Sequence, residues 1–311
     1  MFNRIISFYT RYFSIWVVLC GAAAYFWPGP FLSAAGYNKY FFALTMFGIG
    51  VVLEASDFKR IAERPIIVLI GCTAQFTIMP LGAFALTKIF HMPAELAVGL
   101  ILTGSAPGAM ASNVMCYVAK ADTAYSVSLT TVSTLLCPVL TPLLTLMLAG
   151  AVMKVEFGAM MISILQMVVL PLFVGFGVRH FLKEKIEKIL VIFPAISVTF
   201  IIFICALVIA QNKGYLAEVT GIILITGVVL NIYGMSTGYG VGKFFKMEVK
   251  QRRTLAIEIG MQNAGLGVVL ALEHFGRQAA IPAAAFVFIC IITASLLSAY
   301  WQRSDLAVQK S

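Results

Sequence analysis

Glu258 is the one carboxylate that the sequence places deep within an apolar segment. An acid at the middle of a bilayer costs about 2.5 to 3.5 kcal/mol even on insertion scales, so a compensating group must lie beside it. Glu54 and Asp57, by contrast, stand next to Lys59 and Arg60 at the end of an apolar run, where headgroups and water can solvate them. We expect those two acids to form an interfacial charge cluster and Glu258 to belong to a site.

Neutral oxygen-bearing side chains recur in the segments that we expect to lie near Glu258. They are amides and hydroxyls on four different apolar runs: Gln75, Ser112, Asn113, Ser126, Thr130 and Gln262. One carboxylate among neutral oxygens and freed backbone carbonyls suits a hard cation, and sodium fits this inventory better than a divalent ion. A lone Ser or Thr in a membrane helix usually bonds to its own backbone, so the clustering is what favours a site.

Helix-breaking residues interrupt two of the apolar runs, at residues 104–113 and 258–267. Unwound backbone at membrane depth is tolerated only where it lines a cavity, and matched breaks point to a transporter binding site. Ordinary Gly/Pro kinking is the alternative, and it is weaker for two matched segments that both carry amides. Half-helices beginning near Ala109 and Asn263 would aim free N–H groups into the cavity, which favours an anionic substrate with Asn263 as a partner.

Membrane helices must position these residues. Of the 311 residues, 61% are hydrophobic and 11% are charged, whereas a soluble domain carries about 25% charged residues. One crossing takes roughly 20 apolar residues, so the chain has room for about ten. The fold class is therefore an all-α polytopic membrane protein. Apolar runs bounded by charges and by Gly or Pro predict ten transmembrane helices: 11–27, 40–55, 64–89, 94–119, 122–149, 157–178, 189–211, 215–242, 252–273 and 278–301.

Loop charges predict the orientation of the chain. Alternate loops divide the 22 Lys and Arg residues unevenly, and cytoplasmic loops carry the excess of positive charge. Both termini are therefore expected on the cytoplasmic side of the cytoplasmic (inner) membrane. The net charge of +9 is spread over loops rather than gathered on one face, so we expect membrane lipid and no nucleic acid as a partner. The richer side includes Arg4, Arg11, Lys183, Lys185, Lys188 and Lys310.

The two halves of the chain, residues 1–150 and 151–311, show the same order of features. Each has five predicted helices, and the fourth helix of each half carries the interruption and the amides. Five is an odd number, so the second half must enter the membrane from the opposite face. We therefore expect two inverted five-helix repeats.

These motifs, in this order, resemble the bile acid:sodium symporter family, including its bacterial members. The resemblance runs the full length of the chain and is carried by residues 50–60, 104–108, 111–113, 122–134 and 258–267. It implies a panel domain of helices 1, 2, 6 and 7 and a core domain of helices 3, 4, 5, 8, 9 and 10. Within the core, the two broken helices 4 and 9 would cross at their breaks.

The resemblance also implies two sodium sites and a substrate site. The first sodium site would use Ser112, Asn113, Ser126, Thr130 and Glu258. The second would use Gln75, Gln262, Glu258 and the backbone carbonyls of Ile259 and Met261. Substrate contacts are implied at Asn263, Met110 and Thr293, and the bulky Met110 stands where some relatives have a small polar residue.

The expected function is secondary active transport: sodium-coupled symport of a small organic anion by alternating access. The resemblance implies that the anion is bile acid-like or a small carboxylate such as pantoate or a keto acid. The oligomeric state is left open between a monomer and a larger assembly. Proton coupling through Glu258 and, less favoured, a channel are the alternatives. An enzyme is not expected, because no Ser–His pairing or metal-ligand spacing surrounds the three histidines, His91, His180 and His274.

Overall fold

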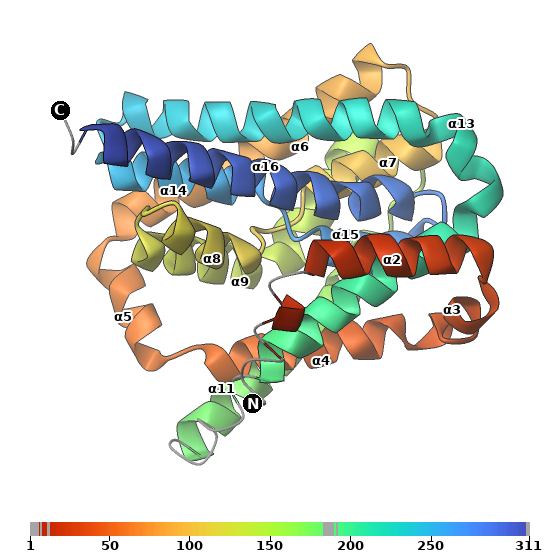
Figure 1. The fold of residues 1–311 in the computed structure, drawn as a ribbon, viewed down its shortest axis with the longest axis horizontal. Coiled ribbons are helices and arrows are strands. Elements are labelled where there is room, and N and C mark those ends of the chain that lie inside the picture. Colours follow the sequence, from red (N-terminus) through yellow and green to blue (C-terminus); the bar gives the residue numbers. More distant parts are fainter. Residues whose placement is uncertain (1–5, 7, 11–12, 183–189, 191, 309–311) are drawn as a thin grey trace.

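The chain is an all-helical polytopic membrane protein in the computed structural model, which describes residues 6, 8–10, 13–182, 190 and 192–308 (Figure 1). Within these ranges, five helices are long and apolar enough to cross a membrane, or six if one bent pair is a single span. The predicted starts of two helices, at residues 11 and 189, lie outside the described residues, as do several of the predicted cytoplasmic charges: Arg4, Arg11, Lys183, Lys185, Lys188 and Lys310.

The first half of the chain follows the predicted helices closely. The predicted helix at 94–119 is divided in two by a non-helical stretch, as its Gly and Pro residues led us to expect. The elements are α2 (Phe13–Phe26), α3 (Gly29–Ser33), η1 (Ala35–Tyr37), α4 (Asn38–Val52), α5 (Ala55–Glu63), α6 (Pro65–Ile89), α7 (Ala94–Gly104), α8 (Ala111–Val118) and α9 (Thr123–Ala149).

The second half contains a second divided helix and one helix of unusual length. The predicted helix at 252–273 is interrupted after Gly260, and the predicted helix at 157–178 passes through one π-helical turn. The elements are α10 (Phe157–Ile164), η2 (Leu165–Val169), α11 (Leu170–Leu182), α13 (Ile192–Phe244), α14 (Val249–Gly260), α15 (Ala264–His274) and α16 (Ala280–Val308).

The loop predicted between the helices at 189–211 and 215–242 is wrong, because α13 runs through these residues as a single helix. A straight helix of 53 residues would be about 80 Å long, more than twice the thickness of the hydrocarbon layer. Figure 1 shows how the length is accommodated: α13 turns back on itself at the edge of the molecule. We call residues 192–211 its first limb and residues 215–244 its second limb. Gly214, with open space around it, lies between them.

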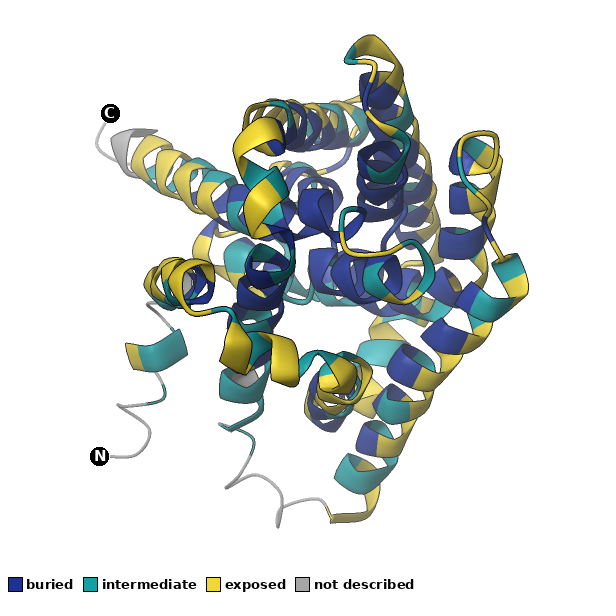
Figure 2. Cartoon of the chain, turned by 90° about the vertical axis from the view of Figure 1, so that its right-hand side faces the viewer, coloured by how far each residue is buried: buried dark blue, intermediate teal, exposed yellow. Residues whose placement is uncertain are grey.

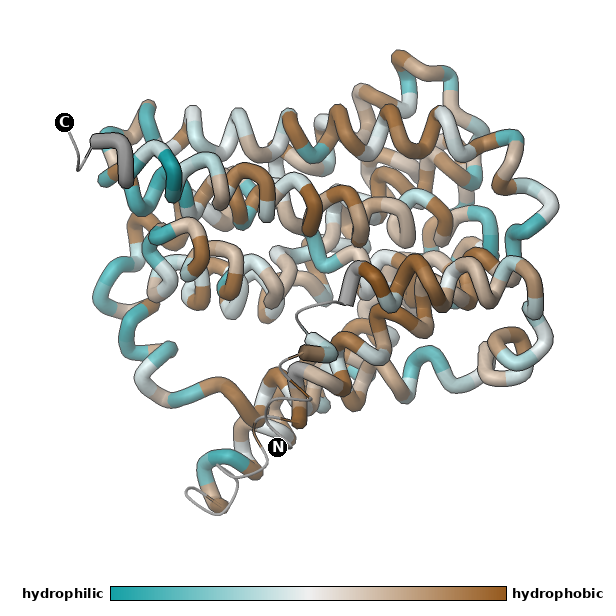
Figure 3. Tube along the Cα trace, viewed as in Figure 1, coloured by the Kyte–Doolittle hydropathy of each residue, from teal (hydrophilic) through white to brown (hydrophobic). Residues whose placement is uncertain are grey.

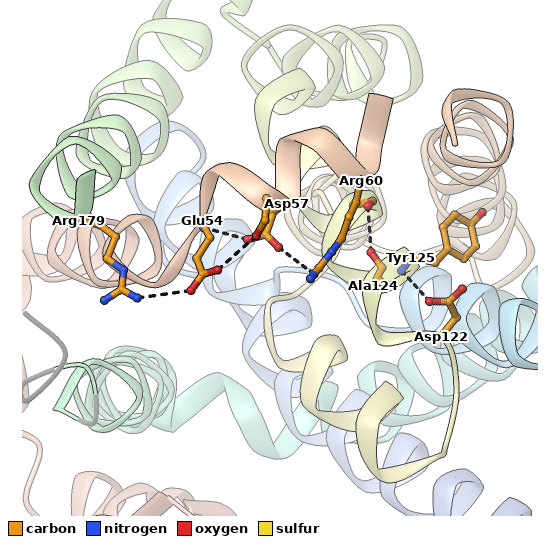
Figure 4. Close-up of polar contacts among 9 residues, drawn as sticks. Glu54, Asp57, Arg60, Asp122, Ala124, Tyr125 and Arg179 are labelled. Atoms are coloured by element: carbon orange, nitrogen blue, oxygen red, sulfur yellow. Dashed lines mark hydrogen bonds and ion pairs between the residues drawn. The ribbon is translucent and has the colours of Figure 1, made fainter. Parts of the chain in front are cut away.

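A short polar helix that the sequence did not predict, α5, follows α4 at an angle of 74°. Its start is a capping box, in which the backbone N–H of Glu54 donates to Asp57 at 2.9 Å. The expected charge cluster is present here, since Arg179 on α11 pairs with Glu54 at 3.4 Å and Arg60 pairs with Asp57 at 3.3 Å (Figure 4). Figure 3 shows that α5 is largely hydrophilic, which suits a helix lying at the membrane surface.

Helices α4 and α11 approach backbone to backbone. A Cβ added to Gly50 would lie 2.0 Å from the carbonyl oxygen of Leu172, and one added to Gly175 would lie 2.2 Å from that of Phe47. Glycine is therefore required at both positions, as in other close contacts between membrane helices. The first limb of α13 packs on the same group through Phe200, whose ring lies 5.3 Å from that of Phe42 on α4.

The remaining long helices form a second group around the two divided helices. The second limb of α13 packs against α6, α14 and α16, and α7 packs against α6, α9, α15 and α16. Figure 2 shows buried residues facing the middle of the bundle and exposed ones facing outward. Many outward side chains are large and apolar, such as Ile66, Leu69 and Leu296, as expected where lipid replaces water.

Candidate functional site

The two interrupted helices meet at their breaks, which pair as an isolated antiparallel β-bridge. The backbone N–H of Ala109 donates to the carbonyl of Met261 at 2.9 Å, and that of Asn263 donates to the carbonyl of Pro107 at 2.8 Å. Backbone groups released by one break thus find partners in the other, which is how unwound chain can persist inside a membrane protein.

Gly108, in the middle of the first break, lets a carboxylate approach the backbone. A Cβ at this position would lie 2.9 Å from Oε2 of Glu258 and 3.7 Å from Oγ of Ser133. The Gly108 N–H donates to the Ser133 hydroxyl at 3.3 Å. Ser133 is a neighbour of the site that sequence reasoning missed, because one hydroxyl among many on α9 carries no distinguishing signal.

Glu258 is buried, and its carboxylate is surrounded by hydroxyl groups from α8 and α9. The hydroxyls of Ser112 and Ser126 donate to its Oε1, and that of Thr130 donates to its Oε2 at 3.0 Å. Oδ1 of Asn113 accepts from Ser126 at 2.8 Å. The structure therefore brings together all five residues expected for the first sodium site, from three separate helices.

These hydroxyl groups have fewer hydrogens to donate than there are acceptor oxygens around them. Ser112 also contacts the Ala109 carbonyl at 2.6 Å, and Thr130 also contacts the Ser126 carbonyl at 2.9 Å and the Asn113 side chain at 3.4 Å. A hydroxyl has a single hydrogen to donate, so three hydrogens face a larger number of acceptors. None of the ion pairs in the described part of the chain involves Glu258. The result is an electron-rich cage that lacks positive charge.

The residues expected for the second sodium site form a connected chain of amides and carbonyls. Nε2 of Gln75 donates to Oε1 of Gln262 at 2.7 Å, and Nε2 of Gln262 donates to the carbonyl of Ile259 at 3.1 Å. Both amides are buried. The carbonyl of Met261 already accepts from the other break, but a carbonyl oxygen has a second lone pair. Ile259, Met261 and Gln262 follow Glu258 at the end of α14 and in the break, whereas Gln75 lies on α6.

The three expected substrate contacts are not all in one place. Oδ1 of Asn263 accepts from the N–H of Leu266 at 3.1 Å, which caps the start of α15. Sδ of Met110 lies 3.8 Å from the side-chain amide of Asn113. Both half-buried residues therefore adjoin the breaks. Thr293 on α16 instead donates to the carbonyl of Ile289 in its own helix at 2.7 Å, the ordinary arrangement for a membrane threonine.

One buried amide beside the breaks was missed by sequence reasoning. Asn231, on the second limb of α13, is fully buried, and its Nδ2 donates to the carbonyl of Gly260 at 2.8 Å. An amide in the middle of an apolar run was a signal that could have been read, since such groups are costly to bury.

Residues 40–219 match the model of the Sodium Bile acid symporter family, which is more than half of the chain. The chain belongs to this family. The resemblance noted from the motifs is therefore confirmed, and the match covers α4 to the first part of α13.

Sequence similarity between this symporter family member and its relatives extends over almost the whole chain. It is 40% identical over 97% of its length to the uncharacterized sodium-dependent transporter YocS of Bacillus subtilis, covering 94% of that protein. It is 33% identical over 94% of its length to the probable chloroplastic sodium/metabolite cotransporter BASS1 of Arabidopsis thaliana, covering 73% of it. The rice protein BASS2, also named a probable sodium/metabolite cotransporter, is 33% identical over 98% of the chain. These are names of transporters, in agreement with the prediction that the protein is not an enzyme.

Proposed function

We propose that the protein is a sodium-coupled symporter that carries an organic anion by alternating access. The observation that carries this proposal is the hydrogen-poor cage around Glu258 at the crossing of two broken helices. Broken helices of this kind form ion and substrate sites in secondary transporters. The names of the relatives, a sodium-dependent transporter and sodium/metabolite cotransporters, support the same ion.

Sodium would satisfy the cage without rearranging it. The hydroxyls of Ser112, Ser126 and Thr130 can keep their hydrogens on the carboxylate while their lone pairs face the ion, with Asn113 adding a carbonyl oxygen. A single positive charge would balance Glu258, and an all-oxygen ligand set suits a hard cation. A second sodium would lie among the amide chain and the freed carbonyls: Gln75, Gln262, Glu258, Ile259 and Met261.

The architecture that we propose has ten crossings in two inverted repeats, residues 1–150 and 151–311, with both termini cytoplasmic in the inner membrane. Figure 1 shows α5, the start of α14 and the end of α16 at the same end of the bundle, which supports placing these three segments on one side of the membrane. The group of α2, α4, α11 and the first limb of α13 would be the panel, and the remaining long helices would be the core. Relative motion of these two groups would give alternating access.

The substrate site that we propose lies between the break at Asn263 and the panel. A Cβ on Gly265, in the first turn of α15, would lie 3.6 Å from Phe200 and 3.8 Å from Phe42, so two panel rings adjoin this helix start. The positive end of α15 would favour an anionic group, and the rings would favour an apolar body. Met110 and Thr293 would shape the remaining wall. A bile acid, pantoate and a keto acid are the candidates to test.

Coupling would arise because one cation takes its ligands from several separate elements. The Glu258 cage takes ligands from α8, α9 and α14, so an ion there would order both breaks at once. Ordering the breaks would also fix the start of α15, which is the proposed anion contact. Sodium and anion would therefore raise each other's affinity by the same factor, as linkage requires.

The test is uptake of labelled anions into proteoliposomes, together with a sodium titration of thermal stability. Glu258→Gln keeps the shape of the side chain and removes its charge, and it should abolish both the sodium-dependent rise in Tm and sodium-driven uptake. Glu156→Gln is the matched control. Glu156 is exposed and pairs at 2.6 Å with Lys154, which holds the pKa of its carboxyl below its usual range. This variant should keep the full sodium response.

The same assay separates the alternatives. Uptake that persists without sodium and follows pH would show proton coupling through Glu258, since a proton on this carboxyl would also supply a missing hydrogen to the cage. Flux that neither saturates nor accumulates substrate against its gradient would show a channel. Either result would overturn sodium symport.

A further inference from the structure

The second break is held by a third helix, α13, which is separate from the two interrupted helices. Asn231 reaches from the second limb of α13 to the carbonyl of Gly260, the last residue of α14. One turn later, a Cβ on Gly234 would lie 3.2 Å from the carbonyl oxygen of Ile259. The backbone of α13 therefore lies directly against the break, and Asn231 supplies the polar contact between them.

Three successive carbonyls at this break have different partners. The carbonyl of Ile259 accepts from the Gln262 side chain, and that of Met261 accepts from the backbone of the first break. The carbonyl of Gly260, between them, accepts from Asn231. The first two are the carbonyls that the proposed function assigns to the second sodium ion. The third, the carbonyl of Gly260, is not assigned to the ion, and its partner comes from α13.

The amide of Asn231 is not explained by packing. It is fully buried, and its Oδ1 has no hydrogen-bond partner among the residues that the structure describes. A buried polar atom without a partner costs about 1 to 3 kcal/mol, a cost that an apolar side chain at this position would not carry. A cost of this kind at a break is typical of a residue kept for function.

We propose that Asn231 is a positioning residue for the second sodium site. Its amide holds the Gly260 carbonyl on the α13 side and so restrains rotation of the peptide between Gly260 and Met261. With that peptide held, the carbonyls of Ile259 and Met261 keep the directions in which they can face the ion. Without the amide, the Gly260 carbonyl would be buried and unpaired, and the peptide would turn to find another donor or the cation itself. This inference rests on the proposed sodium symport.

The same helix provides a matched control. Asn212, near the bend of α13, is also buried, and its Nδ2 donates to backbone carbonyls at Val208 and Arg277, at 2.9 Å and 3.1 Å. Its Oδ1 likewise has no partner within the described ranges. It differs from Asn231 in lying away from the breaks. Loss of a buried amide on α13 can thus be compared at two places, of which one adjoins the proposed site.

The experiment compares Asn231→Leu with Asn212→Leu in the full-length protein. Asn231→Leu should raise the sodium concentration at half-maximal uptake, and the midpoint of the sodium-dependent rise in Tm, by about tenfold, while the maximal uptake rate changes little. Asn212→Leu should lower Tm in sodium-free buffer and leave both midpoints as in the wild type. Should Asn231→Leu not yield folded protein, Asn231→Ala carries the same expectation.

Two results would overturn the inference in distinguishable ways. A wild-type protein that shows no sodium response removes the proposed function and this inference with it. A wild type that responds to sodium, together with an Asn231 variant of unchanged midpoints, leaves sodium symport in place and removes only the positioning role.

Discussion

Gly108→Ala is the sharpest test of how the first break serves the carboxylate. The added Cβ would lie 2.9 Å from Oε2 of Glu258, closer than non-bonded carbon and oxygen atoms normally approach. The carboxylate must move to relieve this contact, because the backbone at residue 108 is held by its hydrogen bond to Ser133. Oε2 is also the atom that accepts from Thr130 at 3.0 Å, so this hydrogen bond is the first to be lost.

The size of the effect follows from that hydrogen bond. A hydrogen bond to a charged group contributes about 1.5 to 3 kcal/mol, and losing it should displace the carboxylate from the cage. If the whole loss falls on the sodium-bound state, sodium affinity falls by about 10- to 150-fold. The backbone itself is not strained by the substitution, because Gly108 is not among the residues with positive φ.

A sodium titration of Tm in detergent measures this change directly. Gly240→Ala is the control, since Gly240 lies in the second limb of α13 with open space where a Cβ would be added. Alanine in a helix interior is favoured over glycine by about 1 kcal/mol, so this variant should be slightly stabilised with an unchanged sodium midpoint. A Gly108→Ala protein with the wild-type midpoint would refute the argument that glycine is needed for the carboxylate to approach.

Two further predictions concern stability rather than ion binding. Arg253 on α14 donates two hydrogen bonds to Asp305 on α16, at 2.8 Å and 2.6 Å. Either single variant, Arg253→Met or Asp305→Leu, should therefore lower Tm more than the double variant does. A double variant whose loss of Tm equals the sum of the two single losses would argue against coupling. Gly175→Ala places a Cβ 2.2 Å from a backbone carbonyl oxygen of α4. It should destabilise the protein by roughly 1 to 3 kcal/mol or more, measured by thermal unfolding. A variant of normal stability would mean that α4 and α11 can move apart at little cost.

Much of the fold could be read from hydropathy because membrane insertion is a local property of the chain. Runs of apolar residues predicted α2, α4, α6 and α9 to within a few residues, and Gly and Pro in the middle of two runs marked both breaks. Errors arose where local signals compete with distant contacts. The polar residues before Gly214 resembled a loop, yet backbone hydrogen bonding continues through the bend of α13. Helix α5 was missed because it is too short and too polar to resemble a crossing.

The site shows the same division. The cost of burying an acid is a property of the segment around it, so the sequence by itself singled out Glu258 and the amides and hydroxyls that could accompany it. Their arrangement depends on contacts between residues far apart in the chain, such as the hydrogen bond from Ser112 to Glu258, whose positions differ by 146 residues. Only the tertiary structure decided that the two breaks pair backbone to backbone and that three hydroxyl hydrogens serve more oxygens than they can satisfy. It also decided that Asn231, an unremarked amide in an apolar helix, lies against the break, because hydrophobic patterning records which residues are buried but not which of them meet.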